Sequence, residues 1–185
     1  MNKVNKVLLH QYVLFGLFGL LILRKILFGS FYFDLGILWW LMGGMFGFLF
    51  VFIDSFVFDL FAHPNDVWSD RIKAFFDKRV IKDNIETLLR EDQEPKVQIM
   101  RSILFLFVWF VLGFLTMTSV VNSFSRGLVL GIGTHLVFDF VYDYFYDSKR
   151  FEKWFWQIKR EIKHEEKRNV MMVVCFLFFI LATGF

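Results

Sequence analysis

A histidine and an aspartate four residues apart lie inside the otherwise apolar stretch GIGTHLVFDFVYD, residues 131–143. Helical residues four apart share one face, so His135 and Asp139 can bind one ion or form a hydrogen bond with each other. Asp143 repeats the spacing. Imidazole and carboxylate together suit Zn²⁺, Mn²⁺ or Fe²⁺, and a bound metal neutralises a carboxylate that is otherwise costly to bury. This stretch is therefore a candidate metal or catalytic site.

Other ionisable residues lie at the edges of apolar segments. His10 lies at the start of the first long apolar stretch, Asp54 ends the second, and Asp59 and His63 follow with the same four-residue spacing. If the segments are packed helices, these groups converge on one end of the bundle. Alternatively, each side chain reaches water at the membrane surface, caps a neighbouring segment, or pairs with Lys and Arg from the loops. The residues alone leave both interpretations open.

The elements that must position these residues are long apolar stretches. Of the 185 residues, 57% are apolar and 21% are charged, and the charges are segregated into blocks between the apolar runs. A helix needs about 20 apolar residues to cross a bilayer, and it satisfies every backbone hydrogen bond internally. Five stretches approach or exceed that length, at residues 7–23, 35–53, 99–121, 128–146 and 169–185. We therefore predict an all-α fold, an integral membrane bundle of about five transmembrane helices.

The distribution of Lys and Arg predicts how these helices are oriented. Of the 21 Lys and Arg residues, 18 lie in the N-terminal tail, residues 64–101 and residues 147–169, whereas the alternate connections hold only Arg24, Lys25 and Arg126. Short loops rich in Lys and Arg stay in the cytoplasm. We therefore predict a multi-pass protein of the bacterial inner membrane, with its N-terminus cytoplasmic and its C-terminus outside. A cleaved signal peptide is the alternative for the first stretch, but the two basic residues at its end favour a retained anchor.

Two charged segments lie on the predicted cytoplasmic side. Residues 64–98 contain two short amphipathic patterns, which predict a helical hairpin that binds a protein partner or covers the end of the bundle. Residues 147–168 combine basic residues with large aromatics, which predicts a basic interfacial helix against anionic lipid headgroups. We expect no nucleic-acid partner, although such an interface has a similar composition. The remaining domains are a membrane bundle of four spans, residues 1–146, and a C-terminal span, residues 169–185.

The stretch that holds His135 also carries a family resemblance. GIGTHLVFDFVYD resembles the Gly-x-x-x-His-Leu-x-x-Asp signature of the bacterial membrane-bound metal-dependent hydrolase family, a group of small multi-span inner-membrane proteins. The Gly-rich stretch that ends at Asp54 and the early His10 are also similar in placement to features of that family. The resemblance implies a hydrolase with a divalent metal held by His10, Asp54, His135 and Asp139. It implies catalytic roles for Asp54, His135 and Asp139.

The chain departs from that family's pattern at two places. Where the family has Pro-Asp-x-Asp-His, residues 51–55 are VFIDS, which keeps only the second carboxylate. Before the third span, Met100 and Arg101 stand where the family has a histidine. His63 is therefore a candidate substitute for a lost metal ligand. These departures leave a second function open, a non-catalytic scaffold or accessory subunit. A transporter is disfavoured because polar residues do not line the outer half of the predicted spans.

Overall fold

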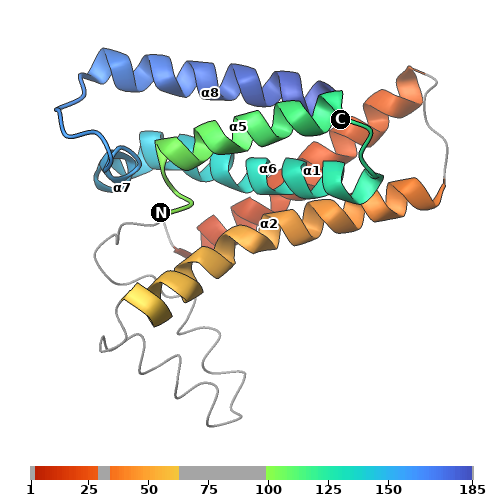
Figure 1. Ribbon diagram of the computed structural model, residues 1–185, viewed down its shortest axis with the longest axis horizontal. Helices are drawn as coiled ribbons and strands as arrows, with labels where there is room; N and C mark the ends of the chain where they lie inside the picture. Colours follow the sequence, from red (N-terminus) through yellow and green to blue (C-terminus); the bar gives the residue numbers. More distant parts are fainter. Residues whose placement is uncertain (1–2, 29–33, 63–98, 185) are drawn as a thin grey trace, which may run out of the picture.

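The structure, a computed structural model, describes residues 3–28, 34–62 and 99–184, and it describes side chains within residues 9–28, 34–51 and 99–184. All the regular secondary structure in these ranges is helical, as predicted. The helices are α1 (Lys3–Leu27), α2 (Leu35–Ala62), α5 (Ile103–Thr118), α6 (Ser123–Tyr146), α7 (Ser148–Lys153) and α8 (His164–Gly184). Figure 1 shows the long helices side by side, with the N-terminus and α7 at one end and the C-terminus at the other.

Three of the described helices are long and apolar enough to cross a membrane, at Leu9–Leu27, Ser123–Tyr146 and His164–Gly184. The predicted number of about five spans is not confirmed. Ile103–Thr118 is a shorter apolar helix, and the side chains of α2 are described only for Leu35–Val51. The third expected span is shortened by Ser102, whose hydroxyl accepts a hydrogen bond from the backbone N–H of Phe105 and begins α5. At about 1.5 Å per residue, α5 reaches only about 24 Å. The apolar residues directly before and after α5 are not helical.

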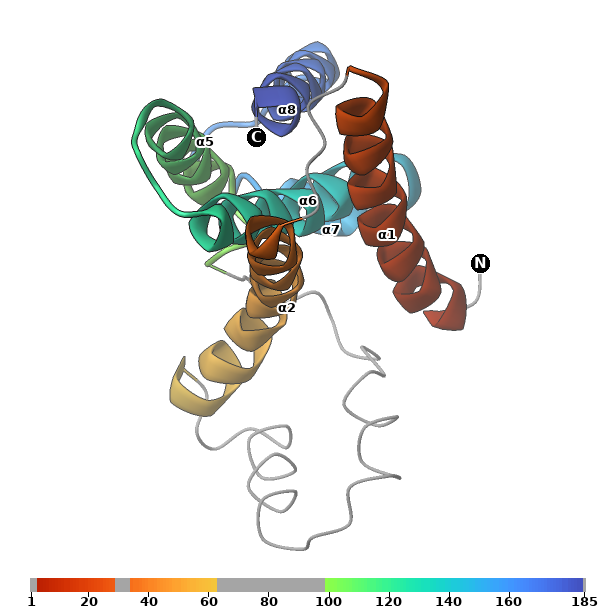
Figure 2. The ribbon, with the colours of Figure 1, turned by 90° about the vertical axis from the view of Figure 1, so that its right-hand side faces the viewer.

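Helix α6 lies at the centre of the molecule. It contacts α1, α2, α5, α7 and α8, and Figure 2 shows it surrounded by the other long helices. The first turn is capped by Asn122, whose side-chain oxygen accepts a hydrogen bond from the backbone N–H of Ser125. A helix enclosed by others has no side that must suit lipid, so it tolerates polar residues that a peripheral helix does not. Burial of α6 therefore explains how a membrane helix can carry His135, Asp139 and Asp143.

The contact between α2 and α6 is made backbone to backbone. A Cβ atom at Gly131 would collide with the Gly44 carbonyl oxygen, and one at Gly47 would collide with the Leu128 carbonyl oxygen. Small residues allow membrane helices to approach this closely. The close approach brings the backbone carbonyls of α2 within hydrogen-bonding distance of side chains on α6.

The prediction of one basic helix over residues 147–168 is wrong. Only the six residues of α7 are helical at its start, turns and loop follow, and α8 begins at His164, five residues before the predicted span at 169–185. The aromatic residues expected beside lipid fold inward instead: Phe151, Trp154 and Phe155 are buried, and the rings of the first two pack on Phe140. Aromatic side chains suit an interfacial helix and a buried plug equally well, so the pattern did not separate the two.

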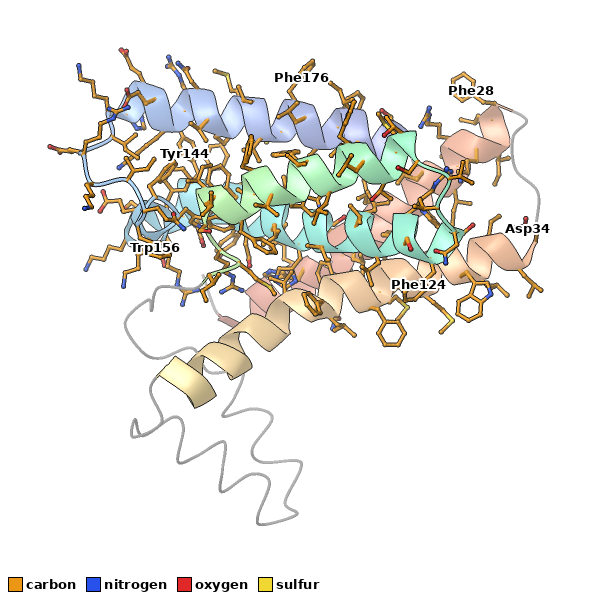
Figure 3. The ribbon with its side chains drawn as sticks, in the orientation of Figure 1. Phe28, Asp34, Phe124, Tyr144, Trp156 and Phe176 are labelled. Atoms are coloured by element: carbon orange, nitrogen blue, oxygen red, sulfur yellow. The ribbon has the colours of Figure 1, made fainter. Side chains whose placement is uncertain are left out.

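The outer surface of the bundle is covered with large apolar side chains. Figure 3 shows Phe176 pointing away from α8 and Trp156 lying at the end of the molecule that holds α7. Exposed apolar residues continue along α1, α2 and α5. A soluble protein of this size does not leave so large a surface apolar, so these helices indicate a membrane protein. The predicted hairpin at residues 64–98 lies outside the described residues.

Candidate metal centre

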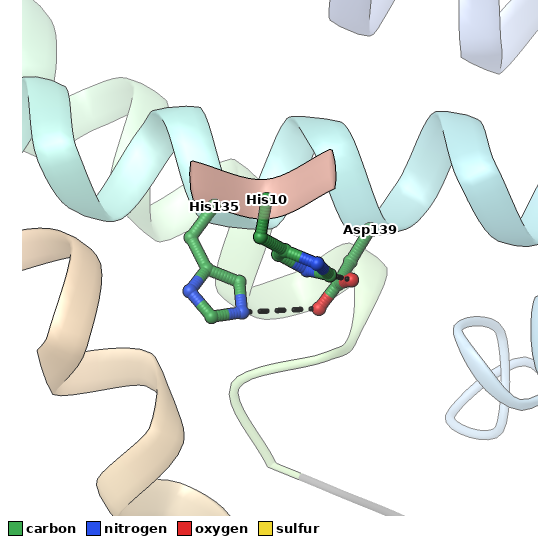
Figure 4. A group of neighbouring side chains, drawn as sticks. All are labelled: His10, His135 and Asp139. Atoms are coloured by element: carbon green, nitrogen blue, oxygen red, sulfur yellow. Dashed lines mark hydrogen bonds and ion pairs between the residues drawn. The ribbon is translucent and has the colours of Figure 1, made fainter. Parts of the chain in front are cut away.

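The predicted pair on α6 lies in the middle of the bundle. His135 and Asp139 are both 0% exposed, and the His135 Nε2 atom lies 3.2 Å from the Asp139 Oδ2 atom. The four-residue spacing therefore places both side chains on one face, as predicted. Figure 4 shows this pair together with His10, which comes from α1.

The tautomer of His135 is fixed by α2. The His135 Nδ1 atom lies 2.8 Å from the backbone carbonyl oxygen of Phe48. A carbonyl only accepts hydrogen bonds, so Nδ1 carries a proton and donates it. In the neutral imidazole, the lone pair then lies on Nε2, the atom that faces Asp139. Histidine ligands of metals use this arrangement, in which the second ring nitrogen donates to a carbonyl and orients the ring.

His10 completes the group from the opposite side. Its Nε2 atom donates a hydrogen bond to the Asp139 Oδ1 atom over 2.8 Å, and only 5% of the residue is exposed. Along α1, His10 continues the buried stripe formed by Leu14, Phe18 and Leu21, at spacings of three and four residues. The helical periodicity of α1 therefore turns His10 toward α6.

The fourth polar side chain of the centre is Arg101, which precedes α5. Its Nη2 atom lies 2.8 Å from the Asp139 Oδ2 atom, the same oxygen that faces His135. The side chain is 14% exposed, so the ion pair is largely shielded from water. With both histidines neutral, the positive charge of Arg101 balances the negative charge of Asp139.

Aromatic rings enclose the polar atoms. The His10 ring centroid lies 4.3 Å from that of Phe138 and 5.0 Å from that of His135. The Phe48 ring lies 4.6 Å from the His135 ring. Apolar walls of this kind exclude water and strengthen every electrostatic interaction inside them. The surroundings therefore favour tight binding of a cation by the few polar atoms present.

The arrangement has the donor set of a divalent metal site. His10, His135 and Asp139 each offer one ligand atom, and these atoms lie within 4.8 Å of one another. Tetrahedral bonds of about 2.1 Å hold ligand atoms about 3.4 Å apart, so metal binding would require the three side chains to close by up to about 1.4 Å. Two imidazoles and one carboxylate are the protein ligands of several catalytic zinc and non-haem iron sites. The residues present therefore fit Zn²⁺, Mn²⁺ or Fe²⁺.

A second buried carboxylate on α6 has different neighbours. Asp143, 3% exposed, accepts a hydrogen bond at its Oδ2 atom from the Trp154 indole N–H over 3.0 Å. The Trp154 carbonyl oxygen accepts a hydrogen bond from the backbone N–H of Ile103, over 2.8 Å. Asp143 thus ties the turn after α7 to α6 and, through that turn, to the start of α5.

Of the predicted site residues, the structure brings together His10, His135 and Asp139. Asp54 lies in α2, but its side chain is outside the described residues, as is the whole of His63. Sequence reasoning missed Arg101 as a member of the site, because it was counted as one base of a cytoplasmic loop and as a departure from the histidine of the resembled family. Its position directly before an apolar segment was the available signal. The contribution of Phe48 is a backbone carbonyl, for which a sequence holds no signal.

Comparisons with protein-family models, with curated proteins and with solved structures found no match to this chain. The resemblance to the membrane-bound metal-dependent hydrolases therefore stays a prediction.

Proposed function

We propose that this protein is a membrane-embedded, metal-dependent hydrolase whose metal is held by His10, His135 and Asp139. The observation that carries the proposal is the hydrogen bond from His135 to the Phe48 carbonyl. With His135 neutral, it directs the lone pair of Nε2 at the Asp139 Oδ2 atom, 3.2 Å away, so that two electron-rich atoms face each other. A bound cation would be stabilised by both atoms, and His10 would add a third ligand once the proton that its Nε2 atom donates to Asp139 has left that atom.

Three protein ligands suit a catalytic site better than a purely structural one. Structural zinc sites are normally closed by four protein ligands, whereas catalytic sites with three keep a position for water or substrate. When bound, a divalent metal lowers the pKa of its water and so provides a nucleophile near neutral pH. Asp139 and the two imidazoles hold the ion, the Phe48 carbonyl orients His135, and the aromatic rings exclude bulk water.

The test is the metal content of the full-length protein purified in detergent without chelators. We expect stoichiometric Zn, Mn or Fe by elemental analysis, and its loss in His135→Ala and in Asp139→Ala. The matched control is His164→Ala, which removes an exposed histidine at the start of α8 and should leave the metal content unchanged. Metal-free wild-type protein that also fails to take up added metal would exclude the proposal.

A second candidate function is a non-catalytic membrane scaffold, and one observation favours it. The ion pair between Arg101 and Asp139 gives the cluster electrical balance with no metal present. In that case the cluster is a buried polar network that fixes how α1, α5 and α6 pack. The same measurement separates the two functions: the scaffold predicts folded wild-type protein without metal, and a loss of folded protein when Asp139 is replaced.

We further propose that the protein lies in a bacterial inner membrane with its N-terminus in the cytoplasm, as the Lys and Arg distribution favours. On that side, the loop between α7 and α8 is a proposed contact with anionic lipid headgroups. Trp156 and Ile158 are exposed there beside Lys159, Arg160 and Lys163. Basic residues near a membrane surface are attracted to anionic lipid.

The lipid contact is tested by thermal unfolding in nanodiscs. We expect a higher melting temperature in phosphatidylglycerol than in phosphatidylcholine, and a smaller difference when Lys159 and Lys163 are both replaced by Gln. Equal melting temperatures of the wild-type protein in the two lipids would contradict it.

A further inference from the structure

Helices α2 and α6 meet in a register that repeats every four residues. Three backbone carbonyls of α2, spaced four residues apart, face three residues of α6 with the same spacing. At the first two places the carbonyl lies against a glycine, and at the third it lies 2.8 Å from the Nδ1 atom of a histidine. The pairs are Trp40 with Gly127, Gly44 with Gly131, and Phe48 with His135. The hydrogen bond that orients His135 therefore depends on the close helix approach that the two glycines before it allow.

The middle residue of α2 in this register, Gly44, also receives a side chain from α1. A Cβ atom at Gly44 would lie 2.1 Å from the Cζ atom of Phe18, so the ring occupies the space that a side chain would fill. The Phe18 ring also packs on Trp40, one turn earlier on α2, with 4.5 Å between the ring centroids. Both Phe18 and Trp40 are 5% exposed. Gly44 therefore contacts α6 through its carbonyl and α1 through the absence of a side chain.

Helix α1 is also the source of one proposed metal ligand. His10 precedes Phe18 by eight residues, about 12 Å along the helix, and both belong to the buried stripe of α1. The His10 Nε2 atom lies 2.8 Å from the Asp139 Oδ1 atom, and the His10 ring centroid lies 6.1 Å from that of Phe48 on α2. The packing of Phe18 against Gly44 therefore sets how close His10 lies to the polar groups on α6.

The space at Gly44 is too small for even one methyl group. Ordinary contact begins at 3.4 Å, so a Cβ atom at 2.1 Å would force the Phe18 ring back by the difference, about 1.3 Å. Because Trp40 packs on the ring, the displacement is passed to α1 and so to His10. A binding site tolerates a misplacement of only about 0.5 Å in its ligands. Retreat of α1 from α2 also adds to the closure that the three ligand atoms already need.

We propose that Gly44 is a positioning residue of the metal centre, which holds His10 beside the ligands of α6. Gly44 supplies no ligand atom and acts through Phe18 and the backbone of α1. This inference rests on the proposed function, because its effect is measured on the metal that His10 helps to hold.

The test measures the Zn²⁺ affinity of folded, full-length protein in detergent, by competition with a chelator. Gly44→Ala should bind the metal about 10- to 100-fold more weakly, the usual cost of losing an outer support of a metal ligand. Gly16→Ala is the control on α1 and should bind as wild type, because a Cβ atom there meets no atom within 4 Å. Gly44→Ala combined with Phe18→Leu should recover most of the loss, because the shorter side chain makes room for the methyl group.

A second comparison shows whether Gly44 acts through His10. In protein that already carries His10→Ala, Gly44→Ala should change the metal affinity by less than about 2-fold, because the ligand that it positions is gone. A general loss of packing would instead lower the affinity equally in both backgrounds. If Gly44→Ala does not fold, Phe18→Leu takes its place in both backgrounds, because it loosens the same contact of α1.

The outcomes separate this inference from the proposed function. Folded Gly44→Ala protein with wild-type affinity, or an equal loss with and without His10, overturns the role of Gly44 and leaves the metal centre standing. Wild-type protein that binds no metal overturns both.

Discussion

Asp139 and Asp143 lie one turn apart on the same helix, and both are buried, yet their surroundings differ. Asp139 is met by two imidazoles and a guanidinium, which come from α1, from α6 and from Arg101, two residues before the start of α5. Asp143 accepts a hydrogen bond from the indole of Trp154, in the turn that follows α7. The imidazoles beside Asp139 can transfer a proton or bind a metal ion, and an indole N–H can do neither. Burial of a carboxylate in a membrane helix therefore does not identify a site by itself, since the neighbours decide its role.

The largest effect is expected from separating α2 from α6. Their close contact places the Phe48 carbonyl beside His135, the neighbour of Asp139. Gly131→Val places a side chain against the Gly44 carbonyl, which belongs to the backbone and cannot rotate away. We expect a loss of stability of about 3 kcal/mol or more, at the upper end of overpacking effects. Thermal unfolding and size-exclusion profiles in detergent measure it. Gly16→Val is the matched control, because a Cβ at Gly16 meets no atom within 4 Å. Equal stability of the two variants would contradict the close packing of α2 on α6.

The comparison of the two carboxylates is tested most directly by replacing each with its amide. Asp139→Asn should weaken metal binding by more than about 100-fold, since even loss of an outer partner of a metal ligand costs about 10- to 100-fold. Asp143→Asn should leave metal binding unchanged. Metal affinity per folded protein, measured by competition with a chelator, provides the readout. His135→Gln serves as a second variant if Asp139→Asn does not fold. Equal losses for the Asp139 and Asp143 variants would remove the distinction between the two sites.

The structural role assigned to Asp143 predicts a smaller effect at its partner. Trp154→Phe keeps an aromatic ring against Phe140 but removes the N–H that Asp143 accepts. We expect a loss of about 1–3 kcal/mol, the cost of leaving a buried polar group without its hydrogen bond. Metal content should not change. Trp156→Phe, at an exposed tryptophan two residues later, is the control and should be neutral. A lower metal content in Trp154→Phe would show that the two carboxylates act together.

The smallest effect is expected at the ion pair outside the bundle. Arg160 contacts both carboxylate oxygens of Glu166, at 2.9 and 3.0 Å, but both groups are exposed. Exposed ion pairs contribute little because water and salt screen them. Glu166→Gln should therefore have the same melting temperature and the same metal content as the wild-type protein. A clear drop in either would show that the loop between α7 and α8 supports the centre.

Part of the candidate site could be predicted from the sequence for simple geometric reasons. The pairing of His135 with Asp139 follows from helical periodicity alone, and the stripe through Leu14 and Phe18 turns His10 inward. The position of Arg101 before an apolar segment was a signal, but its pairing with Asp139 depends on how residues 99–102 pack against α6, which the sequence does not show. The tautomer of His135 depends on the backbone carbonyl of Phe48. Every residue has a backbone carbonyl, so the sequence does not single this one out. Side-chain chemistry is visible in a sequence, and backbone placement is not.

The fold was predicted at the level of class and less well at the level of elements. Long apolar stretches led to an all-helical membrane protein, and three described helices have the length and composition to span. The count of about five spans stays unconfirmed. Ser102 and Ser119 make α5 shorter than the apolar stretch at 99–121, and the side chains of α2 are described only as far as Val51. The predicted helix at 147–168 failed because the buried contacts of Phe151 and Trp154 outweigh the helical pattern of that segment.

The central position of α6 has a consequence for how the protein is made. On the insertion scale, a charged residue at the middle of a membrane helix costs about 2.5–3.5 kcal/mol, and α6 carries Asp139 and Asp143. As a single segment leaving the translocon, α6 would be a poor candidate to partition into lipid. Its partners His10 and Arg101, and the Phe48 carbonyl, are all translated before it. The ribosome thus delivers Asp139 and His135 after α1, α2 and Arg101, the parts of the chain that contribute the other members of their cluster, whereas Trp154, the partner of Asp143, follows α6.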